Sequence, residues 1–299
     1  MRNACWRPRR ESRWTDRVDQ APTRSDGSSA GSSQAQRTAY RARPDTRHYA
    51  ERVDTVVVAV IILATVLTGT ILQRLSGTGV GLVVAPVLAL LLGPGFGVFM
   101  TNVTTVMSGL LIMFAVWRFI NWRAYLLIAP AAAIGAWPAA WLVGALPTAW
   151  LSILLGALVV SALLLTAFAR RIPEWKSPGA AVTAGFLGGF FNTTSGVAAP
   201  VMVIYSRLSR WEQVGFSATL QPVFMTMGIA SVVSKLVMGS VEPGEAGSLP
   251  FGLLLLIIPC SVGFGLLIAT PLTRVVTASL ARRLAMVLAA VGGVAAIVR

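Results

Sequence analysis

The chain contains long apolar runs in which no residue is ionised, and this feature constrains its fold more than any other. One such run, from Ala124 to Phe168, has no charged residue at all. Only 12% of the chain is charged, about half of the ~25% that is typical of soluble domains. A water-soluble domain of this size needs a charged outer surface, which this sequence does not supply. The pattern excludes a soluble enzyme, a nucleic-acid-binding protein and a disordered scaffold, and it predicts a polytopic membrane protein.

The charged residues that do occur are concentrated in the first 54 positions. Residues 1–54 hold 12 Arg and 7 Asp or Glu, which together make 19 of the 36 charged side chains. This segment has no apolar periodicity and buries too little surface to offset the entropy cost of ordering it. We predict a disordered basic N-terminal tail, or a start placed too far upstream, with a weak contact to anionic lipid as the alternative.

A bilayer-spanning helix needs about 20 apolar residues, so the rest of the chain has room for about eight spans. A polar connection at 170–178 divides it into two halves, 55–169 and 179–299. Tryptophans fall near several segment ends, as an interfacial belt places them. The apolar segments are 55–74 continuing into 80–92, 97–117, 124–144, 149–169, 180–191 continuing into 197–206, 214–238, 250–270 and 281–298.

The two halves begin with matching interruptions. The first reads Ser76 to Pro86 and the second Phe190 to Pro200, each rich in glycine or hydroxyls and each ending in proline. Aligning the two prolines gives an offset of 114 residues (86 to 200). In both halves a helix with hydroxyls and an amide follows, which carries Asn102 in the first and Gln221 in the second. We therefore expect an all-α membrane protein of about eight transmembrane helices in two repeats, with the first helix of each repeat broken.

The basic residues leave the orientation open. A tail on the cytoplasmic side also places Arg118–Arg123 and Arg170–Lys176 inside, as the positive-inside rule favours. If the second broken element crosses once, Arg274, Arg282 and Arg283 lie outside, against that rule. If it crosses twice, they return inside, but the halves are then not simple parallel copies.

A break in a membrane helix points to a binding site. Non-helical backbone survives in hydrocarbon only where it is buried in protein or lines a wet cavity. The N–H groups at the start of the second half-helix carry partial positive charge and attract anions, and repeat-built transporters use such pairs of breaks. The predicted binding residues are Gly77, Thr78, Gly79, Gly81, Asn102, Asn192, Thr193, Thr194, Ser195, Gly196 and Gln221.

Packing is the alternative explanation for part of this pattern. Gly77 with Gly81, and Gly185 with Gly189, have the small-xxx-small spacing that lets membrane helices approach closely. Asn102 and Gln221 would serve equally well in interhelical hydrogen bonds. Packing accounts less well for the run from Asn192 to Ser195, which places four polar side chains at one break.

The ionisable residues restrict the chemistry. After residue 54 the only acids are Glu174, Glu212, Glu242 and Glu245, all in or beside predicted connections. The one histidine, His48, is in the tail, and Cys5 and Cys260 have no metal-ligand spacing. We therefore expect no metal or other cofactor, no intramembrane proton relay and an anionic rather than a cationic substrate.

Two basic residues near the predicted spans have alternative interpretations. Lys235 lies close to the end of its segment, and we expect its amine to snorkel to the membrane interface. Arg74 either senses an anion or marks the end of an interrupted helix.

Both interrupted segments resemble the paired signatures of the TauE/SafE sulfite exporter family. They run from Gly77 to Pro86 and from Asn192 to Pro200, with Gly79-Val80-Gly81 where family members commonly have a glycine triplet. The resemblance covers about residues 55–298. It implies eight spans derived from a four-span duplication, and transport of sulfite, organosulfonates or related small organic anions.

The sequence thus predicts a permease for a small anion, such as sulfite, an organosulfonate or a small carboxylate, and not an enzyme. We expect it in a cell membrane, as a multi-pass protein of the bacterial inner membrane, with the lipid bilayer and the anion as its partners and no nucleic acid. Oligomeric state, direction and coupling ion stay open. The alternatives are a membrane assembly partner without transport, which predicts tightly packed breaks, and an intramembrane lipid-modifying enzyme, which needs an acid, base, nucleophile or metal.

Overall fold

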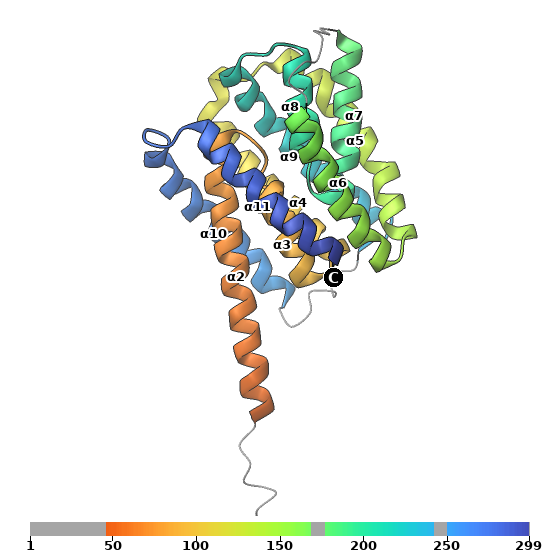
Figure 1. Cartoon of the computed structure of the whole chain (residues 1–299), viewed down its shortest axis with the longest axis vertical. Helices are drawn as coiled ribbons and strands as arrows, with labels where there is room; N and C mark the ends of the chain where they lie inside the picture. The colour runs from red at the N-terminus through yellow and green to blue at the C-terminus, as the bar shows by residue number, and fades with distance from the viewer. Residues whose placement is uncertain (1–45, 169–176, 242–249, 299) are drawn as a thin grey trace, which may run out of the picture. The chain divides into compact units, whose positions relative to one another are not determined.

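The computed structural model describes residues 46–168, 177–241 and 250–298 (Figure 1). Both predicted interruptions belong to one compact unit, which contains the described residues from Ala50 onward. Most of the predicted tail and most of the polar connection at 170–178 lie outside the described residues. The first helix begins at Thr46, ahead of the predicted start at residue 55.

Every regular element in these described ranges is helical, in agreement with the predicted all-α class. The helices follow the predicted apolar segments closely, and both predicted interruptions are present as gaps between helices. The elements are α2 Thr46–Ser76, α3 Gly81–Leu92, α4 Pro94–Val116, the 3-10 turn η1 Trp117–Phe119, α5 Trp122–Ala145, α6 Thr148–Phe168, α7 Pro178–Ser195, α8 Ala199–Leu208, α9 Gln213–Val237, α10 Phe251–Leu272 and α11 Ala278–Val298.

Six of these helices are long and apolar enough to cross a bilayer. They are α2 from Thr55, α4 with η1, α5, α9, α10 and α11. The half-helices α3 and α8 are shorter, as is the described apolar part of α6, Thr148–Val160. The chain is therefore a multi-pass membrane protein, while eight crossings and an internal duplication stay predictions.

The break after α2 is made by a glycine cap. Gly77 has φ +69°, a left-handed conformation that favours glycine, and its N–H bonds to the carbonyl of Gln73 at 2.9 Å. Such a cap satisfies a terminal carbonyl and turns the chain out of the helix. The four residues from Gly77 to Val80 are non-helical before α3 begins at Gly81.

The break after α7 has the same construction. Gly196 has φ +74°, and its N–H bonds to the carbonyl of Asn192 at 2.9 Å. Pro200 lies in the first turn of α8, where the missing N–H costs no helical hydrogen bond. Pro86, in contrast, is the sixth residue of α3, so aligning the two prolines does not superpose the two breaks.

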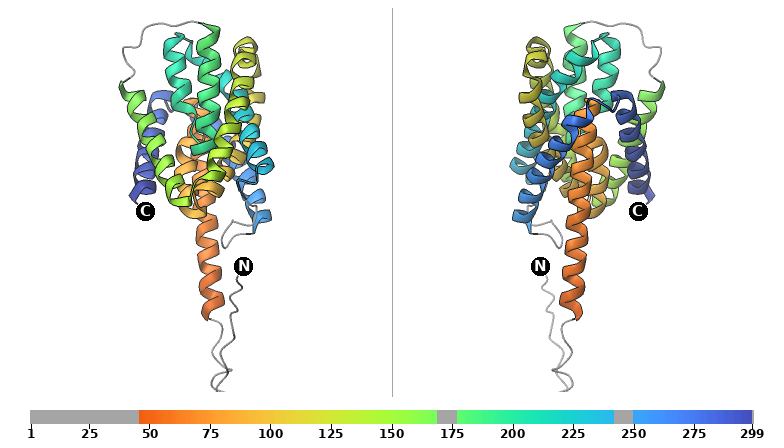
Figure 2. Two further views of the ribbon diagram at one scale, coloured as in Figure 1. Left: turned by 90° about the vertical axis from the view of Figure 1, so that its right-hand side faces the viewer. Right: turned by 90° about the vertical axis from the view of Figure 1, so that its left-hand side faces the viewer.

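Close backbone packing holds the centre of the protein together. A Cβ on Gly185 or Gly189 of α7 would overlap the carbonyl oxygens of Ile128 and Ala132 of α5, respectively. These two glycines therefore serve helix packing, as their spacing indicated. Figure 1 shows α5 and α7 side by side, and Figure 2 shows α11 next to α6.

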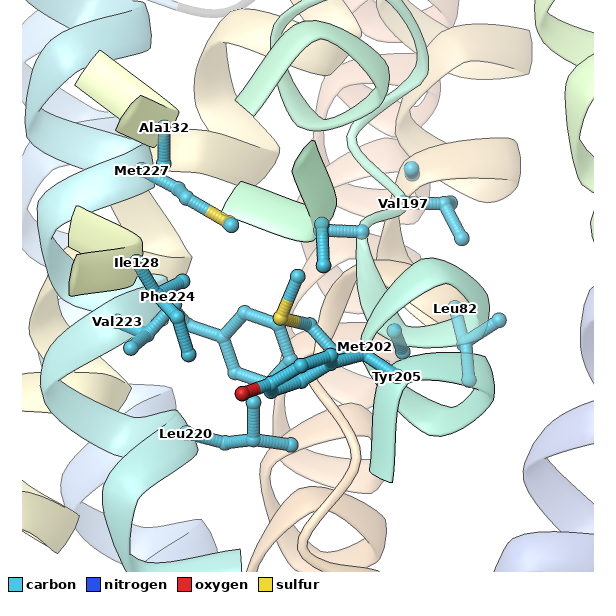
Figure 3. Packing of buried hydrophobic residues seen from close by; sticks show 14 of the residues in the cluster. Leu82, Ile128, Ala132, Val197, Met202, Tyr205, Leu220, Val223, Phe224 and Met227 are labelled. Atoms are coloured by element: carbon cyan, nitrogen blue, oxygen red, sulfur yellow. The ribbon is translucent and has the colours of Figure 1, made fainter. Parts of the chain in front are cut away.

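A large apolar cluster adjoins the second break. It includes Leu82, Val197, Met202, Phe224 and Met227, all nearly or fully buried. In Figure 3 its methionine and phenylalanine side chains occupy the space between Val197 and α5. The polar groups at the breaks are thus sealed on one side by close-packed hydrophobic side chains.

Candidate functional site

The two helix breaks meet inside the protein. A Cβ placed on Gly81, the first residue of α3, would overlap the carbonyl oxygen of Gly196. A Cβ on Gly196 would lie 2.8 Å from the Cβ of Ala85. Only glycine permits this approach, so Gly81 and Gly196, both predicted site residues, bring the breaks into direct contact.

A narrow pocket lies where the breaks meet. Its volume is about 10 Å³, which is room for about one water molecule. The lining comes from the first break and α3, the second break and α8, and the neighbouring helices: Gly79, Gly81, Leu82, Thr105, Asn192, Gly196, Val197, Ala198, Ala199 and Phe224. The sequence did not single out Thr105 or Phe224, although the Thr101-Asn102-Val103-Thr104-Thr105 run marks this part of α4 as polar.

Residues with unused backbone donors from both breaks line this pocket. Within the described part of the chain, the N–H groups of Gly79, Val197 and Ala198 donate to no acceptor. Val197 and Ala198 are buried, and buried unpaired N–H groups are rare and costly. The meeting point of the breaks therefore carries unused hydrogen-bond donors, which suit a negatively charged or oxygen-rich ligand.

Asn102 and Asn192 form a buried amide pair next to the pocket. The side-chain N–H of Asn192 donates to Oδ1 of Asn102. Nδ2 of Asn102 donates to the carbonyl of Val98 at 3.0 Å and to that of Asn192 at 3.3 Å. The pair ties the middle of α4 to the end of α7 and fixes the second break against α4.

A second amide pair lies at the first break. Nε2 of Gln73 donates to Oε1 of Gln221 at 3.0 Å, while Nε2 of Gln221 donates to the carbonyl of Ser217 at 3.0 Å. This pair ties the end of α2 to α9. Gln73 was not predicted as a site residue, although an amide inside the apolar run 55–74 was a visible signal.

The contacts at the two breaks match at one offset in sequence. The capping glycines Gly77 and Gly196 are 119 residues apart. The members of one amide pair, Gln73 and Gln221, correspond by the same offset to those of the other: Gln73 to Asn192, and Asn102 to Gln221. Two further glycines, Gly109 and Gly228, have the same spacing. A Cβ on Gly109 would lie 3.0 Å from the carbonyl oxygen of Gln221, and a Cβ on Gly228 would lie 2.9 Å from the carbonyl oxygen of Asn102. The offset of 119, rather than the 114 from the prolines, relates these matching contacts.

The predicted hydroxyls differ in what they have left to offer. Oγ1 of Thr194 donates to the carbonyls of Phe190 and Phe191, and Oγ of Ser195 donates to that of Phe191 at 2.8 Å. Oγ1 of Thr78 bonds to Oγ of Ser76. Oγ1 of Thr193 is buried with no partner in the described structure, so it is the predicted hydroxyl with an unused donor.

A larger cavity opens beside the first break. Its volume is about 210 Å³, and Arg74 supplies its positive charge. Among the residues that the structure describes, no acidic side chain lines it. The lining residues are Arg74, Leu75, Ser76, Gly77, Ile112, Val116, Phe119, Gln213, Val214, Ser217, Ala218, Gln221 and Ala278. Predicted residues Gly77 and Gln221 thus line this cavity, whereas Asn192 and Gly196 line the narrow pocket.

The structure corrects the expectation for Lys235. Its side chain is completely buried, and Nζ has no hydrogen-bond partner among the described residues, so it does not snorkel to an interface. Lys235 lies near the end of its apolar segment, but it is on the face of α9 that is buried in the protein. The sequence position alone did not show which face that is. Cys260 is exposed on α10.

Comparison with known proteins gives one finding. The family model described as sulfite exporter TauE/SafE matches residues 61–296. That range includes both breaks and both amide pairs. Neither the curated proteins nor the solved structures gave a match.

Proposed function

Because this chain belongs to the sulfite exporter TauE/SafE family of membrane transporters, we propose that it is a permease for a small oxyanion, with the paired helix breaks as its binding region. Sulfite, an organosulfonate and a small carboxylate share the chemistry that the region favours. Each presents compact, negatively charged oxygens that accept hydrogen bonds. The cell membrane is the proposed location.

The observation that carries the proposal is that residues with unused backbone donors line the pocket at the meeting point. The N–H groups of Gly79, Val197 and Ala198 have no acceptor in the described structure, and Asn192 lines the same pocket. An oxyanion at this point satisfies donors that would otherwise stay unpaired. The start of each half-helix adds partial positive charge without requiring an ionised side chain.

In this conformation the anion has no room at the breaks. The pocket there holds about one water, whereas the cavity that contains Arg74 has a volume of about 210 Å³. We propose that the structure represents a state open toward the Arg74 cavity and closed at the Gly81–Gly196 contact. Transport then requires the two breaks to part, which is the alternating-access step in repeat-built transporters.

The matched contacts support an internal duplication. If the halves are related repeats, the capped breaks and the amide pairs are equivalent elements on two sides of one site. Exchanging their conformations would close the Arg74 cavity and open the opposite side. The site residues predicted from sequence are then divided between the two sides: Gly77, Thr78 and Gln221 at the first break, Asn102 and Asn192 to Gly196 at the second, and Gly79 and Gly81 where they meet.

Flux of anions and cations into liposomes tests this function. Purified protein should admit labelled sulfite or sulfoacetate at a saturable rate above that of empty vesicles, and should exclude a similar-sized cation such as methylammonium. A folded protein that passes no small anion would contradict the proposal. It would favour the assembly-partner alternative, which the tight packing at Gly81 and Gly196 would also fit.

A further inference from the structure

Three buried polar side-chain atoms, one at the end of α7 and two on α9, have no hydrogen-bond partner in the described structure. They are Oγ1 of Thr193, Oγ of Ser231 and Nζ of Lys235. All three side chains are completely buried, with 0% of their surface exposed. A buried polar group without a partner costs free energy, so these three groups need an explanation.

Their positions are related to the Arg74 cavity by the offset that relates the two breaks. Adding 119 to Arg74, Ile112 and Val116, which all line that cavity, gives Thr193, Ser231 and Lys235. The unpartnered side chains thus occupy the places where a second cavity, equivalent to the first, would have its lining. The positive charge lies on the long helix α9 in one case and on the broken helix α2 in the other.

Contacts of Asn102 link the parts of α7 and α9 that carry these residues. Thr193 directly follows Asn192, whose side chain is bonded to Asn102. Gly228 packs against the carbonyl of the same Asn102, and Ser231 and Lys235 follow Gly228 one and two turns later along α9. Residues spaced in this way share one face of a helix, so this face continues from Asn102 toward the side away from Arg74.

We propose that Thr193, Ser231 and Lys235 form a second binding station for a small oxyanion, closed in this structure and open when the Arg74 cavity closes. The proposal rests on the function proposed above and adds the side on which the anion leaves or enters. The hydroxyls donate to anion oxygens and the amine supplies the charge. The cost of leaving these groups unpaired in the closed state favours opening once an anion is available.

Replacing Lys235 by Met tests the station, with sulfoacetate as the probe in detergent-solubilised protein. Removing an unpaired buried amine should raise the melting temperature of the anion-free protein. The same change should abolish at least half of the stabilisation that sulfoacetate gives to the wild type, and should lower its flux in liposomes by about tenfold, the loss of about 1.4 kcal/mol of anion binding. Thr193→Val and Ser231→Ala should each weaken the sulfoacetate effect without lowering the melting temperature of the anion-free protein.

A neighbouring residue provides the matched control. Ser234 is equally buried, but its Oγ donates to the carbonyl of Ser231 at 3.2 Å. Ser234→Ala should lower the melting temperature slightly and leave the effect of sulfoacetate intact. If Lys235→Met retains the wild-type response to sulfoacetate and the wild-type flux, the station is wrong.

The experiment separates this proposal from the transport function. Lys235-dependent stabilisation by sulfoacetate in a protein that passes no anion would support the station and contradict the permease. Anion flux that depends on Arg74 but not on Lys235 would support the permease and overturn the station.

Discussion

Gly81 of α3 touches the carbonyl oxygen of Gly196 so closely that a single methyl group on Gly81 would overlap it. These residues belong to breaks that are far apart in sequence, and their contact closes the proposed transport path between the two sides. The contact explains why a glycine at each position is required by geometry as well as by backbone conformation. In the proposed mechanism, it is also the point at which the two breaks must separate for transport.

Gly81→Ala should destabilise the closed conformation. The added methyl group meets backbone rather than a flexible side chain, and overpacking of this kind costs about 1–3 kcal/mol. We expect a lower melting temperature for the purified protein in detergent. Gly263→Ala in α10 is the matched control, because a Cβ there meets nothing within 4 Å and alanine is the better helix former. Equal melting temperatures for Gly81→Ala and the wild type would contradict the close contact.

The Asn102–Asn192 amide pair should behave as one energetic unit. Each single change to Ala leaves a buried amide group without its partner, at a cost of about 1–3 kcal/mol. The double variant should lose less than the sum of the two, with a coupling of about 0.5–3 kcal/mol. Unfolding of the four proteins of this cycle in denaturant measures the coupling. Additive losses would show that the bond between these side chains does not stabilise the protein.

Arg74 should make the electrostatic potential of the larger cavity positive. Val214 lines this cavity and is exposed, so Val214→Cys reports on it once Cys5 and Cys260 are replaced by Ser. The measured quantity is the ratio of the reaction rate of an anionic methanethiosulfonate reagent to that of its cationic analogue. This ratio should be higher for the cysteine at position 214 than for a free thiol in solution. Arg74→Gln should reduce that ratio by about tenfold, since one unit charge nearby acts on the two reagents in opposite directions.

An arginine outside the cavity provides the control for this experiment. Arg283 is exposed on α11 and does not line the cavity, so Arg283→Gln should change the ratio little. If Arg74 only complements the negative end of the α2 dipole, its loss will lower stability and leave the reagent ratio unchanged. That result would remove the cavity from the transport path.

Hydrophobicity predicted the all-helical class and the positions of most described helices. Helix ends agree with the apolar segments within a few residues for α4, α5 and α9, because a bilayer requires a nearly continuous apolar run for each span. Both breaks were visible, since glycine and hydroxyl clusters inside such a run oppose a regular membrane helix. What sequence patterns could not supply was the partner of each group. Asn102 and Gln221 were equally plausible in packing or binding, and only the structure joins them to Asn192 and Gln73.

Two sequence interpretations failed for identifiable reasons. Matching prolines gave an offset of 114, but proline is tolerated both inside α3 and in the first turn of α8, so it marks no common position. The capping glycines are tied to a left-handed backbone conformation and give 119 instead. Lys235 was expected at an interface because it lies near the end of its apolar segment. That position carries no information on which face of the helix is buried, so the expectation was wrong.

Flux through the wild type and Asn192→Ala tests the central claim most directly. Labelled sulfoacetate should enter liposomes that contain folded wild-type protein at a saturable rate. Asn192→Ala, at equal amounts of folded protein, should reduce this rate by about tenfold, as the loss of one charge-assisted hydrogen bond predicts. Equal rates for the two proteins, or no entry with the wild type, would contradict an anion path through the paired breaks.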